Sequence, residues 1–141
     1  MWLDRKGSTV LEVAECKRLL AIAANLDLIG RVGVGTDQAP VIVPVNFKVS
    51  DSQIAARIGR GFLSSAAADH LVAFEVDYVD SKGGWAWSVL ARGLATVTER
   101  MAEAEPDPGA RPLVPVPGEQ LLTIRPDVLT GRRFELSHQP P

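Results

Sequence analysis

The chain has 141 residues, 46% of them apolar, so it can fold as one domain, 1–141, with a packed core. Fifteen basic and seventeen acidic residues give a net charge of −2, which excludes a broad basic surface for nucleic acid or for an anionic membrane. Apolar runs stay short of the roughly 20 residues that span a bilayer, and the charged start has no signal core behind it, so we expect a soluble cytoplasmic protein.

The reactive side chains are few. Cys16 is alone, which excludes an internal disulfide, and with only His70 and His138 beside it the sequence predicts no metal site. His70 lies at a helix-to-strand junction with no local pattern of a catalytic triad, so we expect a structural role for it. The sequence therefore predicts no catalytic side-chain cluster.

Residues 11–25 place apolar side chains on one side of a helix, with Ser8 or Thr9 available as its N-terminal cap. From residue 28 onward β-branched residues dominate, and turn residues separate three runs: 28–35, 41–49 and 53–58. These runs predict three consecutive antiparallel strands.

The alanine-rich segment 61–68 predicts a helix of about two turns. Residues 71–79 alternate with a period of two, which predicts a half-buried strand. Glu75 and Asp77 share one side of it, and we interpret them as a solvated or subunit-facing pair rather than a catalytic one. Residues 85–98 form another extended run, in which Gly93 indicates a bulge or bend.

We expect a short helix at 101–105, a proline-rich surface crossing at 106–117, and strands at 119–125 and 129–136 separated by a turn at Pro126 and Asp127. Six or seven short strands with two or three helices, and no recurring strand-helix alternation, favour a small closed antiparallel barrel over a parallel sheet.

The segment from Arg57 to Gly61 is the strongest candidate for a binding site. There a strand passes an arginine to a glycine-rich helix start, Gly59-Arg60-Gly61. Unpaired backbone N–H groups beside a guanidinium suit an anion, most naturally a phosphate monoester. By itself Arg57 is better explained as an exposed strand arginine.

An ordered set of segments spread from about Leu11 to Phe134 adds to this reading. They are Gly30-Arg31-Val32-Gly33-Val34, Pro44-Val45-Asn46-Phe47, Arg57, Val72-Ala73-Phe74-Glu75-Val76-Asp77, Trp87-Ser88-Val89-Leu90-Ala91-Arg92-Gly93 and Thr130-Gly131-Arg132-Arg133-Phe134. Together they resemble the pyridoxamine 5′-phosphate oxidase-like family of flavin-binding split β-barrels. The resemblance implies a mainly β, six-stranded antiparallel split barrel, a homodimer, and a flavin, FMN, in a groove at the subunit interface.

The resemblance assigns the flavin phosphate to Arg57. Family members commonly have a threonine at the next position and a lysine shortly after the glycine, where this chain has Ile58 and Phe62-Leu63. Each lost contact would cost about 1.5–3 kcal/mol, or one to two decades of affinity. Arg60 could replace the missing cation, and Ser64 and Ser65 could supply hydroxyls one turn further on. Ile58 and Gly59 also belong to the expected cofactor-binding positions.

By the same resemblance, Val45 and Asn46 would lie along the flavin ring, Trp87 and Ser88 would contact the ligand, and Arg132 would reach the cofactor or a partner subunit. Each position also has a structural explanation. Val45 and Asn46 can belong to an ordinary barrel strand, Trp87 can pack in the core, and the paired arginines can be solvent-exposed charges. Since Arg132 and Arg133 are consecutive, at most one of them can face a given pocket. We expect Trp85 to lie in the core or at the rim.

Two functions stay open from the sequence. The first is an oxidoreductase that acts on an unidentified small molecule with FMN or with a deazaflavin coenzyme. The missing threonine and lysine favour the deazaflavin coenzyme over FMN. The second is a split-barrel dimer that binds a small anionic ligand without turnover or has lost its cofactor.

Overall fold

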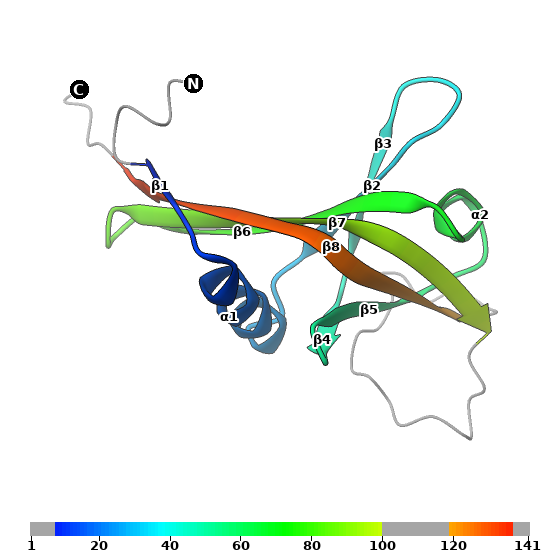
Figure 1. Ribbon diagram of the computed structural model, residues 1–141, viewed down its shortest axis with the longest axis horizontal. Helices are drawn as coiled ribbons and strands as arrows, with labels where there is room; N and C mark the ends of the chain where they lie inside the picture. Colours follow the sequence, from blue (N-terminus) through cyan, green and yellow to red (C-terminus); the bar gives the residue numbers. More distant parts are fainter. Residues whose placement is uncertain (1–7, 100–118, 137–141) are drawn as a thin grey trace.

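The computed structural model describes residues 8–99 and 119–136, and these ranges form eight strands and two helices (Figure 1). The helices are α1 (Val13–Asn25) and α2 (Phe62–Ala67). The strands are β1 (Ser8–Val10), β2 (Gly30–Val34), β3 (Val41–Val45), β4 (Lys48–Ser50), β5 (Gln53–Ile58), β6 (Leu71–Asp80), β7 (Trp85–Glu99) and β8 (Gln120–Glu135). Every strand pairing is antiparallel, which confirms the predicted mainly β antiparallel class.

The sheet curls because its two ends are joined by a very short connection. Its order is β3-β2-β6-β7-β8-β5-β4, with β1 added to β8. The outermost strands β3 and β4 are separated along the chain only by Asn46 and Phe47. The three Cα–Cα steps from Val45 to Lys48 span at most about 11 Å, so the sheet ends must approach each other there. Phe47 fills this corner, buried edge-on against Phe74 with ring centroids 4.8 Å apart.

Helix α1 covers the inner side of the sheet, and the β2–β3 hairpin projects on the other side (Figure 1). The helix buries one stripe of side chains: Cys16, Leu19, Leu20, Ala23 and Ala24. The approach is close at Gly131 of β8, where an added Cβ would lie 2.7 Å from the Cys16 Sγ atom. Only a residue without a side chain lets the helix and the strand pack at this separation.

The helix predicted at 11–25 is confirmed, but its predicted cap is wrong. Glu12 holds the cap position without a side-chain hydrogen bond, and Ser8 and Thr9 belong to β1, which pairs with β8. Their partners Phe134 and Arg133 lie at the far end of the chain. A three-residue strand with such distant partners has no local pattern that predicts it.

Two other predicted boundaries are wrong. The run 41–49 is divided into β3 and β4 at the sheet corner, and the runs 119–125 and 129–136 join as one strand, β8. Pro126 does not end β8, because a register shift opposite Arg92 and Gly93 accommodates the extra residue Asp127. The bulge predicted from Gly93 is confirmed there. The division and the joining cancel in the strand count, so β1 is what brings the seven predicted runs to the eight strands of the described ranges.

The bounds of the remaining predicted elements agree closely with those in the structure. Strands 53–58, 71–79 and 85–98 and helix 61–68 correspond to β5, β6, β7 and α2. Asp51 and Ser52 join β4 to β5 in a two-residue turn with φ of 51° and 62°, as a type I′ hairpin requires. The predicted segments 101–105 and 106–117 lie outside the described residues. Neither described helix is long and apolar enough to cross a membrane.

Candidate functional site

The sheet has a continuous face directed away from the core, which we call the outer face. It carries Leu71, Ala73 and Glu75 on β6 and Leu90, Arg92 and Leu94 on β7. Residues paired across neighbouring strands point to the same side, so the register extends this face to other strands. On β2 and β8 the face continues through Gly33, which pairs with Ala73, and Val128, which pairs with Arg92. Leu121 of β8 pairs with Thr98 on one side and with Arg57 on the other. Arg57 therefore lies on the outer face.

Arg57 is held by a carboxylate that the sequence did not indicate. Its Nε atom donates a 3.0 Å hydrogen bond to Glu119 Oε2, and its Nη2 atom contacts the same oxygen. The side chains of Arg57 and Glu119 are only 11% and 29% exposed. Their strands pair at Arg57 and Leu121, but the two residues are 62 positions apart, too far for a local pattern to reveal the contact.

The loop after Arg57 contains the other predicted anion ligands. Arg60 is exposed and its Nη2 lies 2.5 Å from Glu99 Oε2, and Gln120 donates to the same carboxylate at 3.0 Å. Ser64 Oγ accepts from the Gly61 N–H and donates to the Gly61 carbonyl, closing the start of α2. In the structure the side chains of Arg60 and Ser64, two of those proposed to compensate for the missing threonine and lysine, therefore already have partners.

Of the positions that depart from the family pattern, Ile58 and Leu63 are buried, whereas Phe62 is 51% exposed. Ile58 is 6% exposed and alternates with Arg57 on β5, so it lies on the core side. Leu63 is also part of the core cluster. Gly59 follows directly after β5. Core packing therefore explains why apolar residues occupy positions 58 and 63.

Val45 and Asn46 lie at the corner where β3 passes to β4. Val45 is buried and pairs with Gly30, whereas Asn46 is half-buried and follows the end of the strand. Whether they lie along a ligand stays a prediction.

Trp87 and Ser88 lie on opposite sides of β7. Trp87 is 4% exposed, belongs to the core cluster and stacks near Tyr78, with ring centroids 6.3 Å apart. It lines a hollow under α1 together with Trp85, over whose ring the Arg133 guanidinium lies at 4.9 Å. Ser88 pairs with Asp77 and Arg132, and it lies on the outer face.

Arg132 and Arg133 also point to opposite sides of their strand, as the alternation predicts. Arg132 shares the outer face with Arg57, and its Nη1 donates to Ser8 Oγ at 3.1 Å. Several residues of β7 separate Arg132 from Arg57 along this face, so the structure does not gather them into one pocket.

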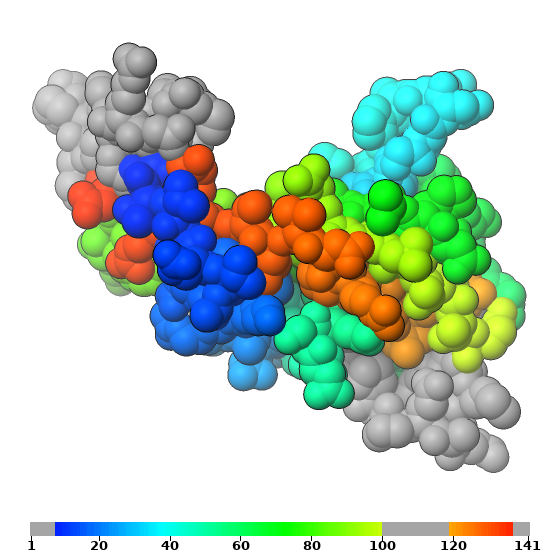
Figure 2. Space-filling view, in the orientation of Figure 1, coloured from blue at the N-terminus to red at the C-terminus, as the bar shows by residue number. Residues whose placement is uncertain are grey.

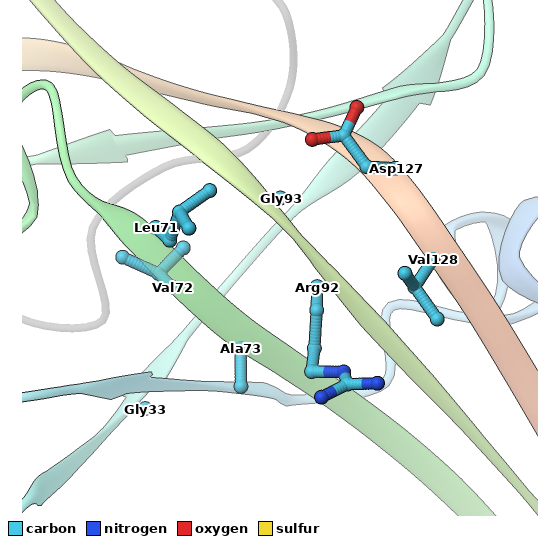
Figure 3. Close-up of a pocket in the computed structure, with 8 residues that line it drawn as sticks. All are labelled: Gly33, Leu71, Val72, Ala73, Arg92, Gly93, Asp127 and Val128. Carbon is cyan, nitrogen blue, oxygen red and sulfur yellow. The ribbon is translucent and has the colours of Figure 1, made fainter.

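A hollow of about 410 Å³ opens on the outer face between the β2–β3 hairpin and β8 (Figures 2 and 3). Figure 3 shows the Arg92 guanidinium between Ala73 of β6 and Val128 of β8, with Leu71 nearby. Leu71 is 74% exposed. Within the described ranges Arg92 has no ion-pair partner, and the hollow that it lines also contains the carboxylate of Asp127. The sequence analysis did not single out Arg92.

Next to this hollow lies a group of charges at Arg31, Glu75 and Asp77. Arg31 Nη1 lies 3.2 Å from Glu75 Oε1 and 3.6 Å from Asp77 Oδ2. Burial, with a hydrogen bond and charge repulsion from Asp77, raises the pKa of Glu75 to about 7 in spite of Arg31. Such a carboxyl can hold or release a proton near neutral pH.

The sequence predicted no metal site and no catalytic role for Cys16 or His70. Among the residues that the structure describes, no group of three or more His, Cys, Asp or Glu side chains could hold a metal ion. Cys16 is buried between α1 and β8, and burial raises the pKa of its thiol. His70 lies in the turn before β6, with Nδ1 2.8 Å from the Ala68 carbonyl. Neither residue faces Arg57.

Comparison with known proteins gives consistent matches along most of the chain. The family model described as pyridoxamine 5′-phosphate oxidase matches residues 12–133. An uncharacterized protein of Mycobacterium tuberculosis is 31% identical over 143 residues, covering 93% of this chain and 88% of the relative.

Two solved structures match equally broadly. The FAD binding protein from Mycobacterium smegmatis is 32% identical with a TM-score of 0.71, covering 90% of this chain and all of the relative. A candidate pyridoxamine 5′-phosphate oxidase from Corynebacterium glutamicum is 28% identical with a TM-score of 0.73, covering 94% and 98%. The sheet described above is therefore the split barrel of these relatives, and the predicted fold is confirmed.

Proposed function

Because the chain belongs to the pyridoxamine 5′-phosphate oxidase family, we propose that it binds a flavin on the outer face of its sheet and acts as a flavin-dependent oxidoreductase. The observation that carries the proposal is that the strand pairing places the guanidinium of Arg57 on this outer face. A guanidinium of this kind is suited to a phosphate oxygen. One relative at 32% identity is named an FAD binding protein.

The described residues fit the ring system of a flavin better than its phosphate end. The outer face offers exposed apolar side chains on which a ring system can lie, among them Leu71, Leu94 and Val128. The phosphate end fits a monoester poorly, because Arg57 is paired and positions 58 and 63 are buried and apolar. The proposal therefore includes FMN, FAD and a deazaflavin coenzyme as candidate ligands.

A bound flavin would supply the electron-transfer chemistry, and the protein would supply binding, orientation and exclusion of water. In this proposal Arg57 anchors the phosphate chain, and Ser88 and Arg132 line the same face further along the sheet. Val45, Asn46, Gly59, Arg60 and Ser64 remain candidates for contact through the corner and the loop before α2. Ile58 and Trp87 would contribute by packing beneath the site.

The test is a fluorescence titration of the purified protein with FMN, FAD and the deazaflavin coenzyme, each at fixed salt. We expect one of them to bind, and Arg57→Ala to weaken its binding about tenfold or more, since a charge-assisted contact is lost. Arg18→Ala, which removes an exposed arginine of α1, is the control and should bind as the wild type does. Absence of binding at high micromolar concentration would reject the proposal.

The alternative is a split barrel that binds its ligand without turnover. A specific observation favours it: the phosphate anchor Arg57 is neutralised within the chain. Reduction of the bound flavin by a nicotinamide donor, followed by its reoxidation, would support the enzyme. A bound flavin that no donor reduces would support the alternative.

The proposal includes a homodimer, whose second copy would cover the outer face. This face carries large apolar side chains that are exposed to solvent, and the exposed fractions of Leu71 and Ile42 are 74% and 69%. Light scattering should report a dimer, and Leu71→Glu should shift the protein toward the monomer. Val13→Glu, at an exposed position of α1, is the control that should leave the mass unchanged. A monomeric wild type would reject this part.

A further inference from the structure

The outer face carries an arginine whose charge is available to another molecule. Arg92 of β7 is exposed, and none of the ion pairs within the described residues includes it. Figure 3 shows its guanidinium between Ala73 and Val128, directed away from the carboxylate of Asp127. If a second copy covered this face without a counter-charge, it would bury an unpaired cation, which is costly.

The same face carries two carboxylates that share one cation. Arg31 Nη1 lies 3.2 Å from Glu75 Oε1 and 3.6 Å from Asp77 Oδ2. Burial and the neighbouring Asp77 raise the pKa of Glu75 to about 7 in spite of Arg31, so a second cation beside the two carboxylates would be favourable. The side chains of Glu75 and Asp77 are 33% and 46% exposed, which leaves both within reach of a partner.

Arg92 and these carboxylates lie near one another on the sheet without forming an ion pair. Arg92 pairs with Ala73 across the two strands, and Glu75 lies two residues further along β6 on the same face. Such diagonal neighbours have Cα atoms about 7–8 Å apart. The carboxylate of Glu75 lies at Arg31 of β2 instead. One patch of the sheet therefore presents a cation next to a pair of anions.

This arrangement is complementary to a second copy of itself. In a two-fold symmetric interface, residue i of one copy contacts residue j of the other, and residue j contacts residue i. A two-fold axis that runs between the two stacked faces, midway between Arg92 and Glu75, exchanges these positions. Stacked sheets lie about 10 Å apart, a distance that an arginine and a glutamate side chain can bridge together.

We propose that Arg92 of each copy binds Glu75 and Asp77 of the partner subunit, so that two equivalent ionic contacts join the outer faces and fix their relative position. This inference rests on the proposed function, which includes a homodimer on this face. A second copy fits the face because the same patch supplies the cation and its counter-charges. The exposed Leu71 and Leu94 beside it would be covered by an equally apolar surface.

The experiment measures the dissociation constant of the dimer by sedimentation equilibrium at low salt and pH 8, above the pKa of Glu75. Arg92→Glu places an anion against the carboxylates of the partner subunit, and Asp77→Lys places a cation against its arginine. We expect each variant to dimerise about 10- to 100-fold more weakly than the wild type, because like charges meet at both equivalent contacts.

A mixture of the two variants tests the contact directly. A dimer of one Arg92→Glu chain and one Asp77→Lys chain has opposite charges at both contacts, and so has a dimer of the double variant. We expect both to dimerise within about threefold of the wild type. Recovery in the mixture also shows that each single variant is folded, and circular dichroism checks the same point for each variant alone.

Lys17→Glu on α1 is the matched control for net charge. Lys17 is also exposed and also absent from the ion pairs of the described residues, but it lies on the helix that covers the inner side of the sheet. Its reversal changes the net charge by the same amount as Arg92→Glu and should leave the dissociation constant unchanged. An equal weakening by Lys17→Glu would overturn the inference.

The remaining outcomes separate the ionic contact from the homodimer itself. An Arg92→Glu protein that dimerises as the wild type does would overturn the inference and leave the homodimer intact. Single variants that dimerise weakly but recover neither in the mixture nor in the double variant would also overturn it, because a direct contact must respond to the exchange of charges. A wild type that stays monomeric would reject the proposed homodimer and this inference with it.

Discussion

Arg31 of β2 and Glu75 of β6 face each other across the sheet, with Nη1 and Oε1 3.2 Å apart, and Asp77 lies at the same arginine, 3.6 Å away. One cation thus serves two carboxylates on the outer face. Because burial and Asp77 together outweigh Arg31, the pKa of Glu75 rises to about 7 from its usual 4.5.

This pKa gives the stability a pH dependence of known sign. A carboxyl whose pKa is higher in the folded state favours folding when protonated, so the contribution of Glu75 is complete below about pH 4.5 and is lost as the pH rises through 7. We expect Glu75→Gln to raise the melting temperature by a few degrees at pH 8 and to change it little at pH 4.5. Thermal melts at both values check this, with Glu135→Gln as an exposed control. A larger gain at pH 4.5 than at pH 8 would contradict it.

Gly93 should not tolerate a side chain. Its position at the bulge between β7 and β8 would bring an added Cβ onto the carbonyl of Arg125, a backbone atom that cannot move aside. We expect Gly93→Ala to lower the free energy of unfolding by about 3 kcal/mol. Gly35→Ala, at a position with open space around the added Cβ, should change it by less than about 0.5 kcal/mol. Urea melts of the two variants check the difference, and equal stabilities would refute it.

Ile58→Thr, which would match the residue common in the family, should not improve an anion site. Ile58 lies on the core side of β5, so the variant would bury a hydroxyl and lose packing, at a cost of about 1–3 kcal/mol. Ala55→Thr puts the same side chain on the outer face, where we expect little loss. Urea melts and an FMN titration of both variants check this. A stable Ile58→Thr protein with tighter FMN binding would show that position 58 reaches the ligand.

Cys16 should be unreactive in the folded protein. Its side chain is fully buried against β8, and burial raises the pKa of the thiol, so little thiolate forms at pH 7.5. We expect a thiol reagent to modify it slowly in the native state and rapidly in urea. Fast native modification would mean that α1 opens readily from the sheet.

The sequence pattern predicted most of the local elements because their signals are local. The period-two alternation of β6, the helical stripe of α1 and the glycine at the β7 bulge can all be recognised within a dozen residues. The resemblance of ordered segments to a family predicted the split barrel, which the solved relatives confirm. Strand β1 was missed because its partners lie more than 120 residues away.

For the candidate site, the sequence by itself determined that an arginine stands at the end of a strand before a glycine-rich turn, and it predicted no catalytic cluster. Only the tertiary structure decided that this arginine pairs with Glu119, that Trp87 lies under α1 while Ser88 faces outward, and that Arg92 lines a hollow. The physical reason is that strand pairing and sheet curvature bring distant residues together, and short-range patterns do not encode which strands become neighbours.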